Sequence, residues 1–288
     1  MKAIYKKELA SYFRSMTGYV LIAFLIMFTG IYFMVYNMYQ GYPYFSYALS
    51  AVMTILLIWI PVLTMRSFAE ERKGKTDQLL LTAPVRIRSI VLGKYFAMVS
   101  VFLIPVLVFC LLPLLIKASG TAYLLTDYSA LLQFFLVGCV FIAVGMFFSS
   151  LTESPVIAAV SNFTVIIILY LWSNLLDYIP DAAAANLAVM VVLILCVCGW
   201  LYHLMKNRFL SIVLAASAVI ASIVVFVIDS SLYESLFSEL LGKFDLLAGF
   251  NDAAFNNIFN VPAVILQLTV IAVFIFLTVQ SIEKRRWS

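Results

Sequence analysis

The chain has 288 residues, of which 65% are hydrophobic and only 11% charged, and its mean hydropathy is +1.09. Soluble domains are about 45–50% apolar and about 25% charged, so this composition predicts an integral membrane protein and leaves no room for a soluble domain of ordinary size. The net charge of +4 is no indication of nucleic acid binding, because the position of each charge relative to the membrane matters more than the sum.

Residues 1–17 are predicted to form an amphipathic elbow helix, with a frayed basic tail as the alternative. The apolar side of the helix holds Ile4, Tyr5, Leu9, Tyr12, Phe13 and Met16, and the polar side holds Lys6, Lys7, Ser11 and Arg14. Such a helix lies flat on an anionic leaflet, where each surface cation contributes about 1 kcal/mol. The residues singled out in the elbow are Lys6, Lys7, Glu8, Tyr12, Phe13 and Arg14.

Eight later runs are apolar, and each has about the 20 residues that a helix needs to cross a bilayer. They are residues 18–39, 47–65, 95–116, 129–149, 156–176, 184–204, 209–228 and 263–282. All Lys and Arg residues except Lys117 and Lys243 then fall on one side, and the positive-inside rule places that side, with both termini, in the cytoplasm. The pair at 184–228 is either two full spans or a re-entrant hairpin, and without it six spans keep the same orientation.

The predicted spans contain no Asp, Glu, Lys or Arg. A charge near the bilayer centre costs about 2.5–3.5 kcal/mol on insertion scales and is kept where ion or proton transport needs it. The composition of the spans therefore argues against a proton-coupled carrier, a cation channel, an intramembrane protease or a metal redox protein. Polar residues in the spans, such as Asn162 and Gln267, are expected to make helix–helix contacts. The four cysteines, Cys110, Cys139, Cys196 and Cys198, are expected to pack as small core residues.

Residues 229–262 form the one substantial outer segment. They carry Asp229, Glu234, Glu239, Asp245 and Asp252 against the single Lys243. Leu and Phe residues between positions 232 and 244 recur at helical spacing, which predicts an amphipathic helix. A helix on the outer membrane surface, a docking site for an outer partner and ordinary loop packing all stay open.

The polar stretch from Arg66 to Tyr95 lies between the second and third spans and is the most informative part of the chain. It carries Arg66, Arg72, Lys73, Lys75, Arg86, Arg88 and Lys94. Its pattern predicts two short helical pieces with a break at Gly74 to Thr76, an end at Pro84, and a third helix that starts near Ile87 and enters the membrane. The alternative is an ordinary solvated loop.

Gly74, Lys75 and Thr76 imitate the end of a phosphate-binding P-loop. The first glycine of that motif would have to stand at position 69, which is Ala69, and no strand precedes it. We therefore expect that this chain does not bind ATP.

This order of features resembles the permease subunits of ABC-2-type transporters, and more narrowly the gliding-motility-associated and related multi-span permeases. The similarity rests on the basic elbow, the two spans, the pattern A-E-E-R-K-x-x-T-x-x-L-L-L-T-x-P-V at 69–85, the G-K-Y helix start at 93–95 and the ending VQSIEKRRWS at 279–288. The chain departs from the usual pattern of the family in two respects. The family usually has Gly directly before the Thr, where this chain has Lys75, and the usual six spans become eight.

The resemblance implies an all-α fold with a six-span core plus an extra pair, as one permease domain over residues 1–288. In that family the permeases dimerise and sit on two cytoplasmic ATPase subunits, and the loop after the second span, here 66–93, supplies a coupling helix that enters a groove on the ATPase. Carried over by position, the coupling residues are Glu70, Glu71, Arg72, Gly74, Thr76, Leu79, Leu80 and Pro84. Lys and Arg of the loop would meet carboxylates of the ATPase, and Leu79 and Leu80 would fill its groove.

The function that this resemblance implies is the transmembrane subunit of an ATP-driven exporter in the inner membrane of a bacterium. The chain would be no enzyme by itself and would hold no cofactor, since ATP and Mg²⁺ would be bound by the partner ATPase. The charge-free interior favours a lipidic or amphiphilic substrate. Other expected partners are a second copy or a sister permease, membrane lipids and, as an open point, an extracytoplasmic auxiliary protein. The alternative function is a membrane anchor in an ATPase-driven machine without a transported substrate.

Overall fold

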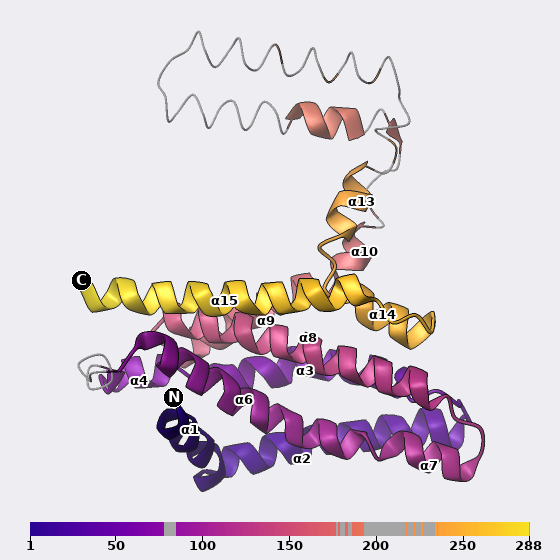
Figure 1. Ribbon diagram of the computed structural model, residues 1–288, viewed down its shortest axis with the longest axis horizontal. Helices are drawn as coiled ribbons and strands as arrows, with labels where there is room; N and C mark the ends of the chain where they lie inside the picture. The colour runs from indigo at the N-terminus through magenta and orange to yellow at the C-terminus, as the bar shows by residue number, and fades with distance from the viewer. Residues whose placement is uncertain are drawn as a thin grey trace. The chain divides into compact units, whose positions relative to one another are not determined.

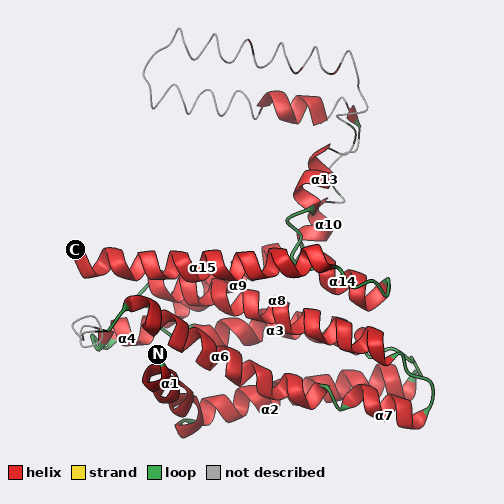
Figure 2. Cartoon of the chain, in the orientation of Figure 1, coloured by secondary structure: helices red, strands yellow, loops and turns green. Residues whose placement is uncertain are grey.

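The structure is a computed structural model that describes residues 1–77, 85–176, 178, 182–183, 186–192, 217, 222, 226, 234 and 236–287. Among these residues all regular structure is helical, and no strand occurs (Figure 2). The predicted all-α architecture is therefore confirmed.

The chain contains long helices and shorter ones (Figure 1). The long ones are α2 (Met16–Phe33), which the π-helix η1 (Met34–Tyr39) continues, α3 (Ser46–Thr64), α6 (Ile87–Phe109), α8 (Leu124–Leu151) and α15 (Val261–Trp287). The shorter ones are α1 (Lys2–Arg14), α4 (Ala69–Lys73), α7 (Leu112–Ser119), α9 (Pro155–Tyr170), α10 (Trp172–Leu176), α13 (Leu236–Gly242) and α14 (Ala248–Phe255).

Five helical stretches in the described residues are long and apolar enough to cross a membrane: Met16–Tyr39, Ser46–Lys73, Ile87–Ser119, Leu124–Leu151 and Val261–Arg286. They contain the predicted spans 18–39, 47–65, 95–116, 129–149 and 263–282. The predicted span 156–176 corresponds to the shorter apolar helix α9, whose 16 residues end at Tyr170, and to α10. The pair at 184–204 and 209–228 lies almost wholly outside the described residues, so its two crossings stay a prediction.

Helix α8 is the centre of the fold. It contacts α3, α6, α9, α14 and α15, and most of its middle turns are buried. The close approach of α3 and α9 requires Gly145, because a Cβ atom there would lie 2.3 Å from both the Thr64 hydroxyl and the Asn162 amide nitrogen. Asn162 donates to the Thr64 hydroxyl at 3.1 Å, so the predicted helix–helix role of this buried polar residue is confirmed.

Two ionisable residues just outside the predicted spans are buried in the helices. Asp127, on the first turn of α8, is fully buried, and its carboxylate accepts a hydrogen bond from the Phe45 N–H at 2.8 Å, at the start of α3. Lys94, on α6, is only 2% exposed. Sequence reasoning placed both positions outside the spans, because it set the span boundaries at the ends of the apolar runs, and it did not predict that either side chain is buried.

The described residues fall into two compact units, 1–170 with 246–288, and 171–245. The outer segment 229–262 is divided between them. In the first unit, Leu246, Leu247 and Phe250 are buried in the core at the start of α14. In the second, Trp172 of α10 donates to the carbonyl of Leu241 at 3.0 Å. Core packing thus accounts for residues 246–254 of this segment. The alternatives for the predicted amphipathic helix between positions 232 and 244 stay open.

Several helix ends of the first unit lie together. The N-terminal helix α1, helix α4, the turn between α8 and α9, and the C-terminal end of α15 gather at one end of the helices (Figure 1), and ion pairs join them. The positive-inside rule assigns this end to the cytoplasm. The candidate functional site is built here.

Candidate functional site

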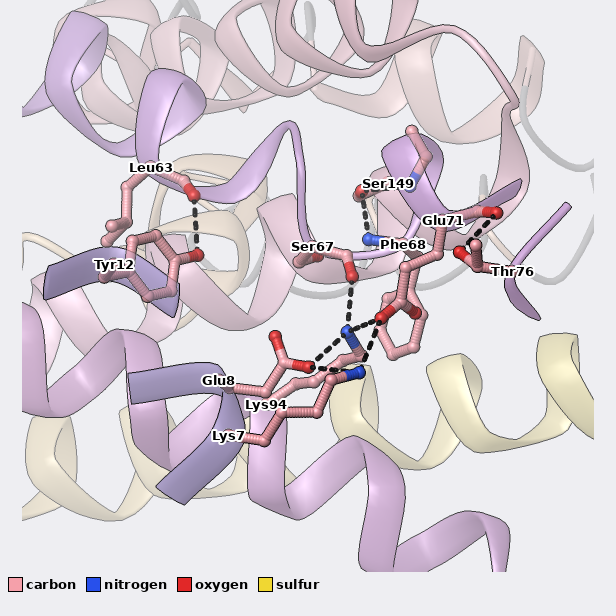
Figure 3. A network of polar contacts seen from close by, with 11 residues as sticks. Lys7, Glu8, Tyr12, Leu63, Ser67, Phe68, Glu71, Thr76, Lys94 and Ser149 are labelled. Atoms are coloured by element: carbon pink, nitrogen blue, oxygen red, sulfur yellow. Dashed lines mark hydrogen bonds and ion pairs between the residues drawn. The ribbon is translucent and has the colours of Figure 1, made fainter. Parts of the chain in front are cut away.

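Helix α4 is short, and its first turn is capped by a side chain from another helix. The N–H groups of Phe68 and Ala69 donate to the hydroxyl oxygen of Ser149, on α8, at 3.1 and 3.2 Å (Figure 3). The same hydroxyl donates to the carbonyl of Met65 at 3.1 Å. Since five residues are too few to form a stable helix alone, this external cap and the burial of Phe68 and Ala69 hold α4 in place.

The C-terminus of α4 ends in a Schellman motif. The Thr76 N–H donates to the carbonyl of Glu71 and the Lys75 N–H to the carbonyl of Arg72, both at 3.0 Å. Lys75 has φ +53°, in the left-handed region, whereas Gly74 does not. The residue directly before the Thr is therefore the position that favours glycine, and here it carries a lysine.

This cap also explains the imitation of a P-loop. Gly74, Lys75 and Thr76 follow a helix, where backbone carbonyls need donors, whereas a P-loop precedes a helix and presents N–H groups to phosphate. The expectation that the chain binds no ATP stays a prediction.

The buried ammonium group of Lys94 connects three segments (Figure 3). Its Nζ lies 2.8 Å from a carboxylate oxygen of Glu71, on α4, and 3.1 Å from one of Glu8, on α1. It also donates to the carbonyl of Ser67 at 2.9 Å, and it lies 5.2 Å from the centre of the Phe68 ring. Lys7 lies 3.9 Å from both carboxylates. We call Lys7, Glu8, Glu71 and Lys94 the Lys94 cluster. Its two cations and two carboxylates balance, so the cluster has no net charge.

A second ion cluster joins α4 to the end of the chain. Arg72 donates to the carbonyl of Ser150 at 2.7 Å and lies 3.7 Å from Glu153, in the turn between α8 and α9. Arg285, on α15, pairs with Glu153 at 3.5 Å and with Asp77 at 3.0 Å. Helix α4 is therefore tied to α8 and α15 through this cluster, and to α1 and α6 through Lys94.

The elbow helix α1 is packed against protein on its apolar side. Ile4, Leu9, Tyr12 and Phe13 pack against the core, whereas Lys6, Lys7, Ser11 and Arg14 are exposed, so the predicted division into two sides is confirmed. Much of the apolar side is covered by α6, where Gly93 lets Ile4 approach closely. Met16 is an exception, with 83% of its surface exposed. Contact of this helix with an anionic leaflet stays a prediction.

The Tyr12 hydroxyl fixes the elbow to the end of α3. It donates to the carbonyl of Leu63 at 3.2 Å (Figure 3). Burial raises the pKa of this phenol, and the carboxylates of Glu8 and Glu70 raise it further, so the group stays a neutral donor at physiological pH. Elsewhere on the elbow helix, the hydroxyl of Tyr5 shares a hydrogen bond with that of Ser100, on α6, at 2.9 Å.

Comparison with known protein families identifies the architecture that carries this site. The ABC-2 family transporter protein family matches residues 2–280, which is nearly the whole chain. The chain belongs to this family. No curated protein matches it.

As an ABC-2 permease, the chain is a multi-pass membrane protein and the transmembrane subunit of an ABC transporter, a transport component that is not itself catalytic. The family implies association with an ABC ATPase. The narrower similarity to gliding-motility-associated permeases stays a prediction, because the match does not address the subfamily.

The fold of this ABC-2 permease brings part of the predicted coupling set together. Glu71 meets Glu8 of the elbow at Lys94, Arg72 lies in the second ion cluster, and Gly74 and Thr76 form the cap of α4. Glu70, Lys6 and Arg14 are exposed. Phe13 packs against the core. Leu79, Leu80 and Pro84 lie outside the described residues, so their predicted roles are not tested.

The expected contact between Lys and Arg of the 66–93 loop and carboxylates of the ATPase stays a prediction. Within the chain, Arg72 of this loop and the neighbouring Lys94 already have partners. The side chain of Arg72 is only 13% exposed. The physical reason is that a cation buried at a helix junction must be paired locally, which leaves only exposed cations such as Lys73 and Lys75 for a partner.

Sequence reasoning missed Lys94, Ser149 and Arg285 as site residues. A signal for Lys94 was present: it continues the stripe of Ile87, Ile90 and Val91 at the spacing of one helix face, all of them buried. A lysine on the apolar face of a helix predicts a buried ion pair. Ser149 lies in unremarkable sequence, and the ending 279–288, although it carries part of the family resemblance, gives no sign of the partners of Arg285, so only the fold reveals both residues.

Proposed function

We propose that this chain couples ATP hydrolysis by a separate cytoplasmic ATPase to export of a lipidic or amphiphilic substrate, with α4 as the coupling helix. The single observation that carries the proposal is the bonding of α4. One short helix is joined through ion pairs and caps to α1, α6, α8 and α15. A displacement of α4 by a partner would therefore act on several membrane helices at once.

The exposed surface of α4 is the part that would receive the ATPase. Glu70, Lys73, Lys75 and Thr76 are exposed, and neither Glu70 nor Lys73 makes an ion pair among the described residues. Glu70 and Thr76 also line a cleft of about 460 Å³ between α1 and α4, most of whose lining residues are polar. This arrangement supports two separate roles within α4: its exposed residues would contact the ATPase, and its buried residues would transmit the resulting motion to the membrane helices.

The proposed assembly has two ATPase subunits, which bind ATP and Mg²⁺, and two permease chains, either two copies of this one or one copy with a sister permease. We place it in the inner membrane of a bacterium. Alternating access of the helices, driven by closure of the ATPase pair, would move the substrate outward.

The first test is to extract the tagged chain gently from its native membrane and to identify co-purified proteins by mass spectrometry. A stoichiometric soluble protein with a Walker motif is expected. If the chain is recovered alone, or with membrane proteins only, the proposal is wrong.

The second test uses the double variant Glu70→Lys with Lys73→Glu, which reverses two exposed charges and leaves both ion clusters intact. We expect the ATPase to be lost from the purified complex while the amount of permease in the membrane stays unchanged. The matched control is Lys117→Glu, an exposed charge at the outer end of α7, which should retain the ATPase. In the intact complex, an ATPase rate that no amphiphile stimulates would favour a membrane anchor over an exporter.

A further inference from the structure

An apolar groove runs between α6, α8 and α15, three helices that pack side by side (Figure 1). Its volume is about 600 Å³, within the range of about 300–1,000 Å³ that is usual for ligand sites. Leu92, Phe96 and Val99 line it on α6, and Phe135 and Phe276 are among the apolar side chains that line it on α8 and α15. A ligand for this groove must therefore be largely hydrocarbon.

One cation stands at the cytoplasmic end of the groove. Arg88 lies on the same stripe of α6 as the groove residues Leu92 and Val99, and it is exposed. The other polar group of α6 in the lining, the Tyr95 hydroxyl, already donates to the carbonyl of Cys139 at 3.2 Å. In contrast to Arg72, Lys94 and Arg285, Arg88 pairs with no carboxylate among the described residues.

The length of the groove matches one leaflet. From Arg88 to Val99, α6 rises about 16 Å at about 1.5 Å per residue. This is about half of the roughly 30 Å hydrocarbon core of a bilayer. The groove thus begins with a cation near the cytoplasmic interface and ends near the middle of the membrane.

We propose that this groove binds an anionic phospholipid of the cytoplasmic leaflet, with an acyl chain against α8 and α15 and the phosphate at Arg88. The planar guanidinium group forms paired hydrogen bonds with phosphate oxygens, and a lipid with net negative charge neutralises the arginine. A helix from a second copy fits these features less well, because it would extend past the groove and would need a carboxylate of its own for Arg88.

Photolabelling of the full-length chain tests the proposal. The chain is reconstituted in vesicles of phosphatidylcholine and phosphatidylglycerol that contain a trace of phosphatidylglycerol with a diazirine in its acyl chain. A second preparation contains the matching phosphatidylcholine probe. After illumination, mass spectrometry of the peptides locates the adducts. We expect adducts at Phe135 and Phe276, several-fold more with the phosphatidylglycerol probe than with the phosphatidylcholine probe.

Three variants make the result specific to the groove. Arg88→Gln should lower labelling by the phosphatidylglycerol probe several-fold. Arg86→Gln should leave it unchanged, because Arg86 is also exposed but does not line the groove. Ala272→Phe adds bulk at an exposed groove position of α15 and should remove the adducts of both probes.

Two outcomes would overturn the proposal. Equal labelling by both probes that Arg88→Gln does not change would mean that the groove is an ordinary lipid-facing surface without preference for an anionic headgroup. Absence of groove adducts with either probe, while other lipid-facing positions are labelled, would mean that protein covers the groove. Neither result depends on the ATPase, so the proposed coupling function stands or falls separately.

Discussion

Lys94 shows how one residue can join several elements at the edge of a membrane. Its side chain is 2% exposed, and its ammonium group contacts Glu8, Glu71 and the carbonyl of Ser67. An isolated buried cation would be costly, but here two carboxylates and a carbonyl compensate for the lost hydration. The consequence is that α1 and α4 cannot separate from α6 without exposing or unpairing this charge.

We predict that Lys94→Met destabilises the protein strongly. Removal of the ammonium group leaves Glu8 and Glu71 close together without their shared cation, and breaking such a buried pair costs about 3–5 kcal/mol. The melting temperature of the purified protein in detergent should fall clearly. Lys73→Met, on the exposed side of α4, should leave it almost unchanged.

A compensated variant separates charge from packing. In Glu8→Gln with Glu71→Gln and Lys94→Met, the three buried or half-buried charges of the junction are removed together. Only Lys7 loses its carboxylate partners, and its exposed side chain is solvated by water, so we expect much of the lost stability to return. If the triple variant is no more stable than Lys94→Met alone, the ion pairs are not the cause of the destabilisation.

Lys75 offers the opposite kind of prediction, a stabilising substitution. Its φ of +53° is unfavourable for a residue with a side chain, so Lys75→Gly should stabilise the cap of α4 by up to about 1 kcal/mol. Hydrogen exchange of the amides of residues 68–77 should become slower. Lys73→Gly, at the last residue of α4, should have the opposite effect, because glycine costs up to about 1 kcal/mol in a helix. Faster exchange in Lys75→Gly would contradict the assigned geometry.

At the scale of elements, α8 caps the start of α3 and the start of α4, the short helix that follows α3. Near the N-terminus of α8, Asp127 accepts the N–H of Phe45 at the start of α3, and near its C-terminus Ser149 accepts the N–H groups of Phe68 and Ala69 at the start of α4. One buried helix thus positions both ends of its neighbour. This arrangement explains how a helix as short as α4 keeps a defined orientation.

We predict that Ser149→Ala loosens α4 without unfolding the membrane helices. The Phe68 and Ala69 N–H groups lose their acceptor, which costs about 1 kcal/mol for a cap of this kind. Hydrogen exchange at residues 68–74 should become faster, and coupling of ATPase activity to the permease should weaken. Ser150→Ala is the matched control, since the Ser150 hydroxyl only donates to the carbonyl of Phe147 on its own helix. Equal effects of the two substitutions would argue against the cap.

At the scale of the whole molecule, two observations group the same helix ends together. The count of Lys and Arg assigns these ends to one side of the membrane, and ion pairs in the structure join them. The elbow, α4 and the C-terminal end of α15 are joined by ion pairs. A cytoplasmic location of these parts follows from the positive-inside rule. This agreement can be tested in intact membranes.

We predict that position 73 is accessible from the cytoplasm and position 39 from the outside. In a variant whose four native cysteines are replaced, Lys73→Cys should react with a membrane-impermeant maleimide only in inside-out vesicles. Tyr39→Cys, at a position that is 91% exposed at the end of η1, should react only in right-side-out cells or spheroplasts. Reaction of both positions from the same side would refute the orientation.

The sequence by itself determined the membrane class, five of the long spans, their orientation as a prediction, the two sides of the elbow helix and the family to which the chain belongs. These properties depend on contiguous residues, because hydropathy, helical period and charge counts are local. Only the tertiary structure decided which charged and polar side chains are paired with other residues of the same chain. Arg285 and Asp77 are 208 positions apart, and Ser149 and Phe68 are 81 apart. No local pattern encodes such pairs, since they form only where the packing of helices around α8 brings their ends together.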